Sequence, residues 1–332
     1  MDGQLPPPLI VLTRQDLMAL MPFGEYVDAV ADAFRMHAQG RAQLPAPMHI
    51  PAGGGGFHVK AGSLPIGPGY AAFKVNANFP DNRARHGLPT IQGAILLFDA
   101  GNGVPVALID SIEITIKRTG AATAVAAQYL ARPESRVATI FGCGAQGRVQ
   151  LAALRHVLDL RQVFLVDNDP AAAEGFAREI ADDGLDVDVP VKPHKAALAS
   201  DVIVTCTSAR TAFLGPADVR AGTFVAAVGA DNPDKSEVDP ALMKKARVVT
   251  DLTEQAVTMG DLHHAIRAGA MQADDVHAEL GDLVAGKKAG RTAAHEITLF
   301  DGTGVGIQDV AACVRAYTLA RARGVGQPLS LS

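Results

Sequence analysis

The residues best suited to chemistry in this chain form a glycine-rich turn between apolar segments. The run Val137–Phe141 predicts a strand, and it leads into the pattern Gly142-x-Gly144-x-x-Gly147. Gly142 would allow a tight turn, Gly144 would leave room for a pyrophosphate, and Gly147 would let a helix pack close to its strand. The free N–H groups at the start of that helix would then face the phosphates.

An acidic residue stands where such a unit recognises a sugar. A second apolar run, Val163–Val166, stops at Asp167, which lies 20 residues after Gly147. A carboxylate at this position can accept hydrogen bonds from a ribose diol. The order of strand, glycine turn, helix, strand and acid therefore predicts a dinucleotide site. The alternative is an ordinary strand–helix–strand crossover that binds no ligand.

Polar residues also follow two later strands. Ligands of doubly wound sheets bind beyond the carboxyl ends of the strands. The segment Thr205-Cys206-Thr207-Ser208 follows one expected strand, and Val228-Gly229-Ala230-Asp231 follows another. Asp231 could hold a substrate amine or activate water. It could equally be a turn acid that caps its own backbone.

Two cations stand out in the first half of the chain. Lys74 lies inside an apolar strand, Tyr70–Asn76, where it points either to solvent or into a pocket. Arg118 is expected in the first turn of a helix over Thr115–Ala131, where a cation opposes the helix dipole. That cost indicates that Arg118 faces an anion, with a surface arginine as the alternative.

The composition excludes several classes of protein. The chain has 332 residues, of which 48% are hydrophobic and 20% charged, as in a folded globular protein. A net charge of −5 and the lack of a basic tract disfavour a nucleic-acid partner. No signal peptide or membrane span is expected, because no apolar run approaches the roughly 20 residues required. Three widely spaced cysteines predict reduced thiols in the cytoplasm, and the histidine spacing predicts no metal site.

The pattern of elements divides the chain into regions of different type. Early in the chain we expect a strand at Leu9–Leu12, a capped helix start at Thr13-x-x-Asp16 and a helix over Gly24–Gly40. Five strands joined by glycine turns then predict an antiparallel sheet; they are Met48–Ile50, Phe57–Ala61, Tyr70–Asn76, Thr90–Phe98 and Val104–Asp110. After the glycine turn, strands alternate with helices, which predicts a parallel, doubly wound sheet. A last helix is expected over Ile307–Arg323.

Taken together, these motifs resemble those of the ornithine cyclodeaminase/mu-crystallin family over almost the whole chain. The motifs are Phe73-Lys74-Val75-Asn76, Gly87-Leu88-Pro89-Thr90, Thr115-x-x-Arg118-Thr119-Gly120, Gly142-x-Gly144-Ala145-Gln146, Val228-Gly229-Ala230-Asp231, Phe300-Asp301-x-Thr303-Gly304 and Gln308-Asp309. The resemblance implies a Rossmann-type NAD-binding domain over residues 116–304. It also implies an α+β substrate-binding and dimerisation domain, formed by residues 1–115 with 305–332, in a homodimer.

The resemblance also implies roles for particular residues. Lys74 and Arg118 match the cations that hold a substrate carboxylate, and Asp231, with Lys74, is expected to be catalytic. The residues expected to bind the cofactor are Thr119, Gly142, Gly144, Ala145, Gln146, Asp167, Thr205, Thr207, Val228 and Gly229. Because an acid at position 167 repels a 2′-phosphate, NAD(H) is expected rather than NADP(H).

The chain departs from the family pattern in the expected substrate pocket. Pro47 stands where the family commonly has a third cation, and Lys60 stands where it often has methionine. We expect Lys60 to supply the missing positive charge from another wall. His58 replaces the glutamate of the ornithine enzymes. Both Lys60 and His58 are therefore expected to contact the substrate, and ornithine is a poorer candidate because its distal ammonium would lack a carboxylate partner.

Three functions follow from this resemblance. The first is an NAD(H)-dependent oxidoreductase that interconverts an amino acid and its imino acid. The second is an ornithine cyclodeaminase, which forms proline and ammonia while NAD is recycled, and the same residues would serve it. The third is a non-catalytic binding protein for small molecules. The pocket departures favour the first function, and the acid at Asp231, which mu-crystallin lacks, disfavours the third.

Overall fold

The computed structural model describes residues 8–331, which form two compact units. Unit 1 consists of the described residues up to Arg118 together with those from Val305 onward, and unit 2 consists of Thr119–Gly304. Helix α4 (Ser111–Leu130) therefore begins in unit 1 and ends in unit 2. No helix among the described residues is long and apolar enough to cross a membrane.

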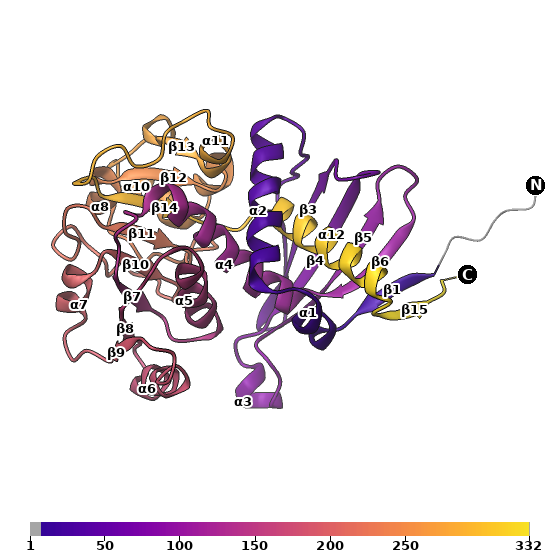
Figure 1. The fold of residues 1–332 in the computed structure, drawn as a ribbon, viewed down its shortest axis with the longest axis horizontal. Coiled ribbons are helices and arrows are strands. Elements are labelled where there is room, and N and C mark those ends of the chain that lie inside the picture. The colour runs from indigo at the N-terminus through magenta and orange to yellow at the C-terminus, as the bar shows by residue number, and fades with distance from the viewer. Residues whose placement is uncertain (1–7, 332) are drawn as a thin grey trace, which may run out of the picture. The chain divides into compact units, whose positions relative to one another are not determined.

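Unit 1 is built on a single sheet. Among residues 8–331 it has seven strands in the order β15-β1-β6-β5-β4-β3-β2 (Figure 1). Their bounds are β1 Leu9–Leu12, β2 Met48–Ala52, β3 Gly55–Leu64, β4 Tyr70–Asn78, β5 Ile91–Asp99, β6 Pro105–Asp110 and β15 Gln327–Leu329. Strands β2 to β6 pair antiparallel, as predicted. Strand β1 pairs with β6 in parallel, so the sheet is mixed. The parallel pairing is possible because a long crossover of helices and strands connects β1 to β6.

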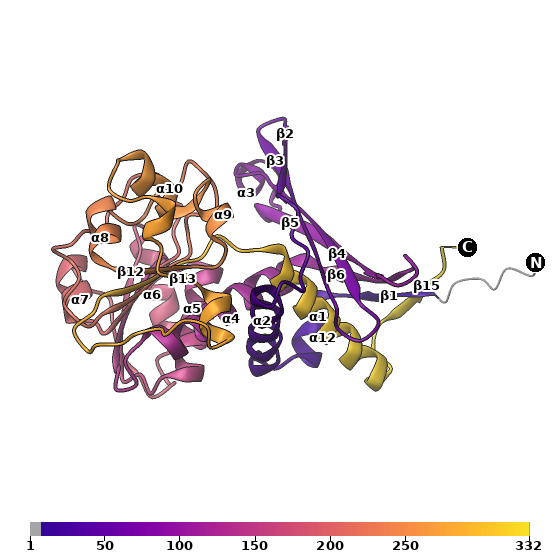
Figure 2. The ribbon, with the colours of Figure 1, turned by 90° about the horizontal axis from the view of Figure 1, so that it is seen from above.

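Helices cover one face of this sheet. Helix α1 (Arg14–Leu20) begins with the expected capping box, in which Thr13 and Asp16 each bond the other's backbone N–H. Helices α2 (Phe23–Ala38) and α12 (Gly306–Arg323) lie side by side on the same face, as both views show (Figures 1 and 2). The short helix α3 spans Asn82–His86.

The C-terminal helix approaches β3 very closely. A Cβ on Gly306 would lie 2.1 Å from the carbonyl oxygen of Ala61, so only glycine fits at the start of α12. A Cβ on Gly62 would lie 3.3 Å from the backbone nitrogen of Ile307, which makes the facing position tight as well. This contact brings the first turn of α12 down onto the sheet, next to β3 and β4.

Unit 2 has the parallel sheet predicted for a doubly wound α/β fold. Within the described residues its eight strands run in the order β13-β12-β14-β11-β10-β7-β8-β9, and every pair is parallel. The bounds are β7 Val137–Phe141, β8 Gln162–Val166, β9 Asp186–Asp188, β10 Val202–Thr205, β11 Phe224–Ala227, β12 Arg247–Thr250, β13 Ala278–Glu279 and β14 Thr298–Asp301. The chain order reverses between β7 and β10, and ligands of such sheets bind at this point.

The helices of unit 2 connect these strands. They are α5 Ala145–Val157, α6 Pro170–Glu179, α7 Pro193–Ala199, α8 Pro240–Lys245, α9 Thr253–Ala256, α10 Gly260–Arg267 and α11 Leu280–Val284. Several of them pack on an apolar core that includes Ile203, Val225 and Leu299 from the central strands. The unit therefore holds the carboxyl ends of its strands in fixed register.

Helix α4 begins at Ser111 rather than at Thr115. The carboxylate of Asp110, the last residue of β6, accepts a hydrogen bond from the backbone N–H of Glu113 at 2.8 Å and so caps the earlier start. Arg118 consequently lies about two turns inside the helix, so the expectation that it opposes the dipole from the first turn is wrong. Its position must have another explanation.

Candidate functional site

The glycine turn of unit 2 has the backbone geometry expected for a phosphate cradle. Gly142 has a φ of +103°, and a Cβ on Gly147 would lie 2.1 Å from the carbonyl oxygen of Gly142. Gly144 is exposed at the start of α5, and a Cβ there would meet no atom within 4 Å. The first three N–H groups of α5 have no intrahelical acceptor. The open space and these donors fit a pyrophosphate.

Asp167 lies beside this turn, at the end of β8. One of its oxygens accepts a hydrogen bond from the backbone N–H of Cys143 at 2.7 Å, and the other accepts one from the backbone N–H of Asp169 at 2.9 Å. Each carboxylate oxygen can accept a further hydrogen bond. Asn168 and Asp169 follow, so the next two positions provide no cation for a 2′-phosphate. The carboxylate is oriented by the backbone and fits a ribose diol.

Arg148 supports the turn and was not identified from the sequence. Its guanidinium donates to the carbonyl oxygens of Cys143 and Gly144, the latter at 3.2 Å. Two further nitrogens bond the carboxylate of Glu179 at 2.6 Å each, which ties α5 to α6. The only sequence signal was its place directly after Gly147. Arg148 therefore fixes the loop and brings positive charge to the cradle.

The cysteines near the turn are not nucleophiles. Burial, reinforced by Asp167, raises the pKa of Cys143 to about 12. Burial and the nearby Glu237 raise the pKa of Cys206 well above its ordinary value. Both side chains are protonated thiols near neutral pH. Within residues 8–331, no group of three His, Cys, Asp or Glu side chains is placed to hold a metal ion.

Glu237 joins the loops that follow β10 and β11, and it too was missed by sequence reasoning. One carboxylate oxygen accepts the backbone N–H of Thr207 at 2.6 Å and its hydroxyl at 2.7 Å. The other oxygen accepts the N–H of Gly229 at 2.9 Å. The N–H groups of Thr207 and Gly229 and the hydroxyl of Thr207 thus already donate hydrogen bonds to Glu237. The neighbouring Thr205 and Val228 are buried, and the N–H of Val228 donates to the carbonyl of Thr205.

A chain of buried carboxyl groups continues from Glu237. The backbone N–H groups of Glu237 and Val238 donate to Asp261 at 2.8 and 2.9 Å, and that of Leu262 donates to Asp301 at 2.8 Å. Burial raises the pKa of Glu237 to about 7 and that of Asp261 to about 6. It raises the pKa of Asp301 well above its ordinary value. Neighbouring carboxyl groups add to the effect of burial at Glu237 and Asp301, and hydroxyl and backbone N–H donors oppose it. No cation among the described residues is a main contributor to the pKa values of these three residues.

Asp231 lies in the exposed loop after β11. Its carboxylate accepts a hydrogen bond from Lys235 Nζ at 2.8 Å, and more than half of the side chain is exposed. Lys235 is itself held by His264, whose Nε2 lies 2.8 Å from the carbonyl oxygen of Lys235. The pairing with Lys235 was not expected from the sequence. It holds the carboxylate of Asp231 beside a cation.

In unit 1, Lys74 and Arg118 meet at one acid. Lys74 Nζ lies 2.6 Å from one oxygen of Asp309, and Arg118 Nε lies 3.0 Å from the other. Arg118 also donates to the side-chain oxygen of Gln308 at 2.6 Å. All four side chains are buried, so Lys74 points into the protein rather than to solvent. Gln308 and Asp309 formed part of the family motif, but their contact with these cations was not predicted.

This cluster carries more positive than negative charge. The pKa of Lys74 is lowered to about 7, chiefly by burial. The positive charges of Arg118 and Lys60 also lower this pKa, whereas the carboxylate of Asp309 raises it. Burial would raise the pKa of Asp309, but Lys74 and Arg118 outweigh this effect and hold it below its ordinary value. One carboxylate thus balances two buried cations, with Lys60 nearby. Such an arrangement favours the binding of an anion.

Lys60 and His58 lie on the same face of the sheet as Lys74. In the pairing of β3 with β4, Lys60 is directly opposite Lys74 and His58 is opposite Asn76. The ring of His58 lies 4.6 Å, centroid to centroid, from that of His49 on β2. Both rings line a hollow of about 400 Å³, bounded also by Asn78, Pro80 and the glycines at 53–56.

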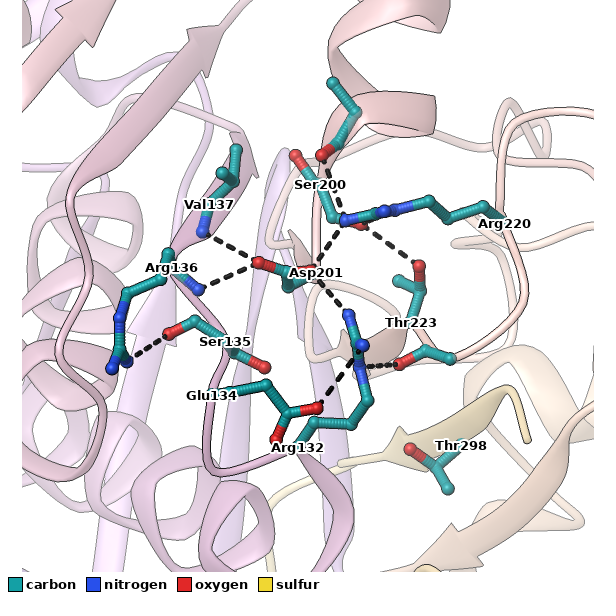
Figure 3. Close-up of polar contacts among 12 residues, drawn as sticks. Arg132, Glu134, Ser135, Arg136, Val137, Ser200, Asp201, Arg220, Thr223 and Thr298 are labelled. Atoms are coloured by element: carbon teal, nitrogen blue, oxygen red, sulfur yellow. Dashed lines mark hydrogen bonds and ion pairs between the residues drawn. The ribbon is translucent and has the colours of Figure 1, made fainter. Parts of the chain in front are cut away.

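Unit 2 contains a second carboxylate network, at the amino ends of its strands. Asp201, just before β10, accepts hydrogen bonds from Arg132 and Arg220 at 2.6 Å each (Figure 3). It also accepts the backbone N–H groups of Arg136 and Val137 at 2.8 and 3.1 Å. These contacts fix the loop that precedes β7, at the edge of the sheet opposite the glycine turn.

The chain is similar to known proteins over almost its whole length. A model of the ornithine cyclodeaminase/mu-crystallin family matches residues 9–323. Alanine dehydrogenase of Archaeoglobus fulgidus is 38% identical over 320 residues, covering 96% of this chain and 98% of the relative. An archaeal alanine dehydrogenase dimer with bound NAD is 37% identical and superposes with a TM-score of 0.93, covering 98% and 99% of the two chains. The structure of Thermococcus litoralis Δ1-pyrroline-2-carboxylate reductase, in complex with NADH and L-proline, is 33% identical and superposes with a TM-score of 0.92. The match covers 97% of this chain and 100% of that chain.

Proposed function

Because this chain belongs to the ornithine cyclodeaminase/mu-crystallin family, we propose that it is an NAD(H)-dependent oxidoreductase that interconverts an amino acid and its imino acid. The observation that carries the proposal is the buried excess of positive charge around Asp309, where a substrate carboxylate would bind. The similar alanine dehydrogenase and pyrroline-2-carboxylate reductase support this class of substrate.

We place the cofactor on the glycine turn of unit 2. The N–H groups of Ala145, Gln146 and Gly147 would hold its pyrophosphate, and Asp167 would accept the ribose hydroxyls. The carboxylate of Asp167 disfavours a 2′-phosphate, so NAD(H) is preferred over NADP(H). Thr119, Thr205, Thr207, Val228 and Gly229 complete the proposed cofactor set. When bound, this group accepts or supplies the hydride.

The proposed substrate site uses the side chains of unit 1. Lys74 and Arg118 would bind the α-carboxylate and so hold the α-carbon in one orientation, which lowers the entropy cost of the reaction. Lys60 would add positive charge to the same site. His58, beside the 400 Å³ hollow, would contact the substrate side chain.

Proton transfer is assigned to Asp231 and Lys74. The Asp231 carboxylate would accept a hydrogen bond from the substrate nitrogen, stabilise a protonated imine and take up the proton that the amine releases on oxidation. Lys235 would hold the Asp231 carboxylate in position between turnovers. Lys74, with a pKa of about 7, can gain or lose a proton near neutral pH.

We further propose that the protein is a cytoplasmic homodimer. The face of the unit 1 sheet opposite α12 carries exposed apolar side chains; they include Met48, Ile50, Phe57, Phe73, Val75 and Leu96. A contiguous apolar surface of this kind is typical of a protein interface. The related alanine dehydrogenase forms a dimer, and the three cysteines of this chain are free thiols, as suits a reducing compartment.

A two-part assay tests the proposal. The purified protein is first incubated with NADH and either a cyclic imino acid or a 2-oxo acid plus ammonium, and oxidation of NADH supports the oxidoreductase. It is then incubated with catalytic NAD⁺ and ornithine. Release of ammonia without accumulation of NADH would identify a cyclodeaminase instead. Saturable binding of NADH with neither activity would identify a binding protein and overturn the proposal.

A further inference from the structure

We propose that Glu237 is a positioning residue of the cofactor site, which sets the spacing between the loops that follow β10 and β11. This inference rests on the proposed function, because those loops carry Thr207, Gly229 and Asp231. Glu237 would not touch the cofactor itself. It would act through the backbone segments on which the nicotinamide end of the cofactor lies.

The contacts of Glu237 connect two neighbouring strands at their carboxyl ends. Strands β10 and β11 pair in parallel, with Thr205 opposite Ala227, and the loops diverge directly afterwards. The carboxylate closes this gap, with two bonds to Thr207 and one to Gly229. A Cβ on Gly229 would lie 2.5 Å from the carboxylate, so the contact also requires a glycine there.

The backbone of Glu237 is held as firmly as its side chain. Its N–H donates to Asp261 at 2.8 Å, and its carbonyl oxygen accepts the N–H groups of Phe213 and Leu214 at 3.0 Å each. The residue is fully buried. A side chain fixed from both directions can transmit its position to the loops that it bonds.

Only an ionised carboxylate can make all three bonds. It has two oxygens and no hydrogen, so both ends accept. Glutamine would turn an N–H₂ group toward the N–H of Gly229, and aspartate would be one methylene too short to reach both loops. Protonation of Glu237 likewise replaces one acceptor by a donor, so at least one of the three bonds must weaken.

The surroundings place this protonation close to neutral pH. Asp261 on α10 faces Glu237 and raises its pKa, and Asp301 on β14 lies behind Asp261. The thiol of Cys206 is also close and is protonated, while the donors from Thr207 and Thr205 oppose the shift. Because burial raises the pKa of Glu237 to about 7, the loops should loosen as the pH falls below that value.

The test measures NADH binding by isothermal titration calorimetry, so it does not depend on turnover. For the wild-type protein we expect the Kd for NADH to rise about tenfold between about pH 8 and about pH 6, as one hydrogen bond is lost. Glu237→Gln should show the weaker Kd at every pH, without this transition. Its kcat should fall together with NADH affinity, while the KM for the amino acid changes little.

A matched control is Asp218→Asn, which alters a buried carboxylate that caps the N–H of Gly215 before β11. This variant should keep the wild-type pH transition. If Glu237→Gln does not fold, Thr207→Val removes the hydroxyl donor instead, and Thr207→Ser should restore the wild-type Kd. Wild-type affinity and an unchanged pH transition in Glu237→Gln or in Thr207→Val would overturn the inference. Failure of the wild-type protein to bind NADH at any pH would instead reject the proposed function.

Discussion

In the parallel sheet of unit 2, buried carboxylates have different partners where the strands begin and where they end. We call these two sides of the sheet the amino edge and the carboxyl edge. At the amino edge, Asp201 is surrounded by the guanidinium groups of Arg132 and Arg220 and by two backbone N–H groups (Figure 3). At the carboxyl edge, Glu237 has hydroxyl and backbone donors on one side and Asp261 on the other. The first carboxylate has its charge balanced, and the second does not.

This difference indicates which edge serves stability and which serves chemistry. A carboxylate whose charge is balanced and that accepts several hydrogen bonds fixes the loops around it. An unbalanced one costs folding free energy and responds to pH, and such groups gather at functional sites. The glycine turn, Asp167 and Asp231 all follow carboxyl ends of strands, on the side of the unbalanced group.

The largest expected effect is that of Asp231→Asn at the carboxyl edge. Loss of the charge that we propose takes up the proton should lower kcat by about 10²-fold or more. Because the side chain is largely exposed, the melting temperature should stay within a degree or two of the wild type, a small change for a surface site. Steady-state kinetics measures kcat, and thermal unfolding measures the melting temperature. A variant that retained full turnover would remove Asp231 from the mechanism.

At the amino edge, Asp201→Asn should do the reverse. It leaves two guanidinium groups without their shared carboxylate, which should cost about 2–3 kcal/mol of unfolding free energy, since the arginines are partly exposed. Urea denaturation measures this loss. The kcat and KM of the folded variant should match the wild type, and a comparable loss of activity would break the distinction between the edges.

The pH dependence of stability sharpens the comparison further. The pKa of Glu237 rises from 4.5 to about 7 on folding, so its contribution is fully present below about pH 4.5 and is lost as the pH rises through about 7. Between these limits the wild type should lose stability relative to Glu237→Gln, by an amount on the order of 1–3 kcal/mol. Chemical denaturation at a series of pH values tests this slope. Parallel curves for the two proteins would contradict it.

A smaller effect is expected at the end of β8. Asp167→Asn keeps the size of the side chain and an acceptor for a backbone N–H, but it removes the charge that repels a 2′-phosphate. The ratio of kcat/KM for NADPH to that for NADH should rise about tenfold, or about 1.4 kcal/mol. An unchanged ratio would show that cofactor choice is made elsewhere.

The sequence predicted those parts of the fold that depend on local patterns. Apolar runs located the central strands, and the roles of Gly142 and Gly147 followed from spacing, because a turn and a close helix approach have short-range requirements. The start of α4 was misplaced because the side chain of Asp110 caps it four residues earlier than the apolar pattern begins. Helices of four to eight residues, such as α9 and α10, show too few turns to give a clear period.

The candidate site was harder to predict than the fold. Lys74 and Arg118 could be singled out as cations in unusual places, but the sequence could not show what neutralises them. Their partner, Asp309, is 191 positions away from Arg118. Glu237 and Arg148 were missed because an acid or a cation near a loop has no pattern that separates a structural role from a solvated one.

The position of Asp309 on α12 has a consequence for synthesis on the ribosome. Strand β4 and the first half of α4 emerge from the ribosome long before α12, which carries the acid that pairs with their two cations, 191 positions after Arg118. A nascent chain must therefore carry Lys74 and Arg118 unneutralised until residues 306–323 leave the exit tunnel. Truncation before α12 would leave these charges without their partner, so unit 1 can reach its native state only after α12 has been synthesised.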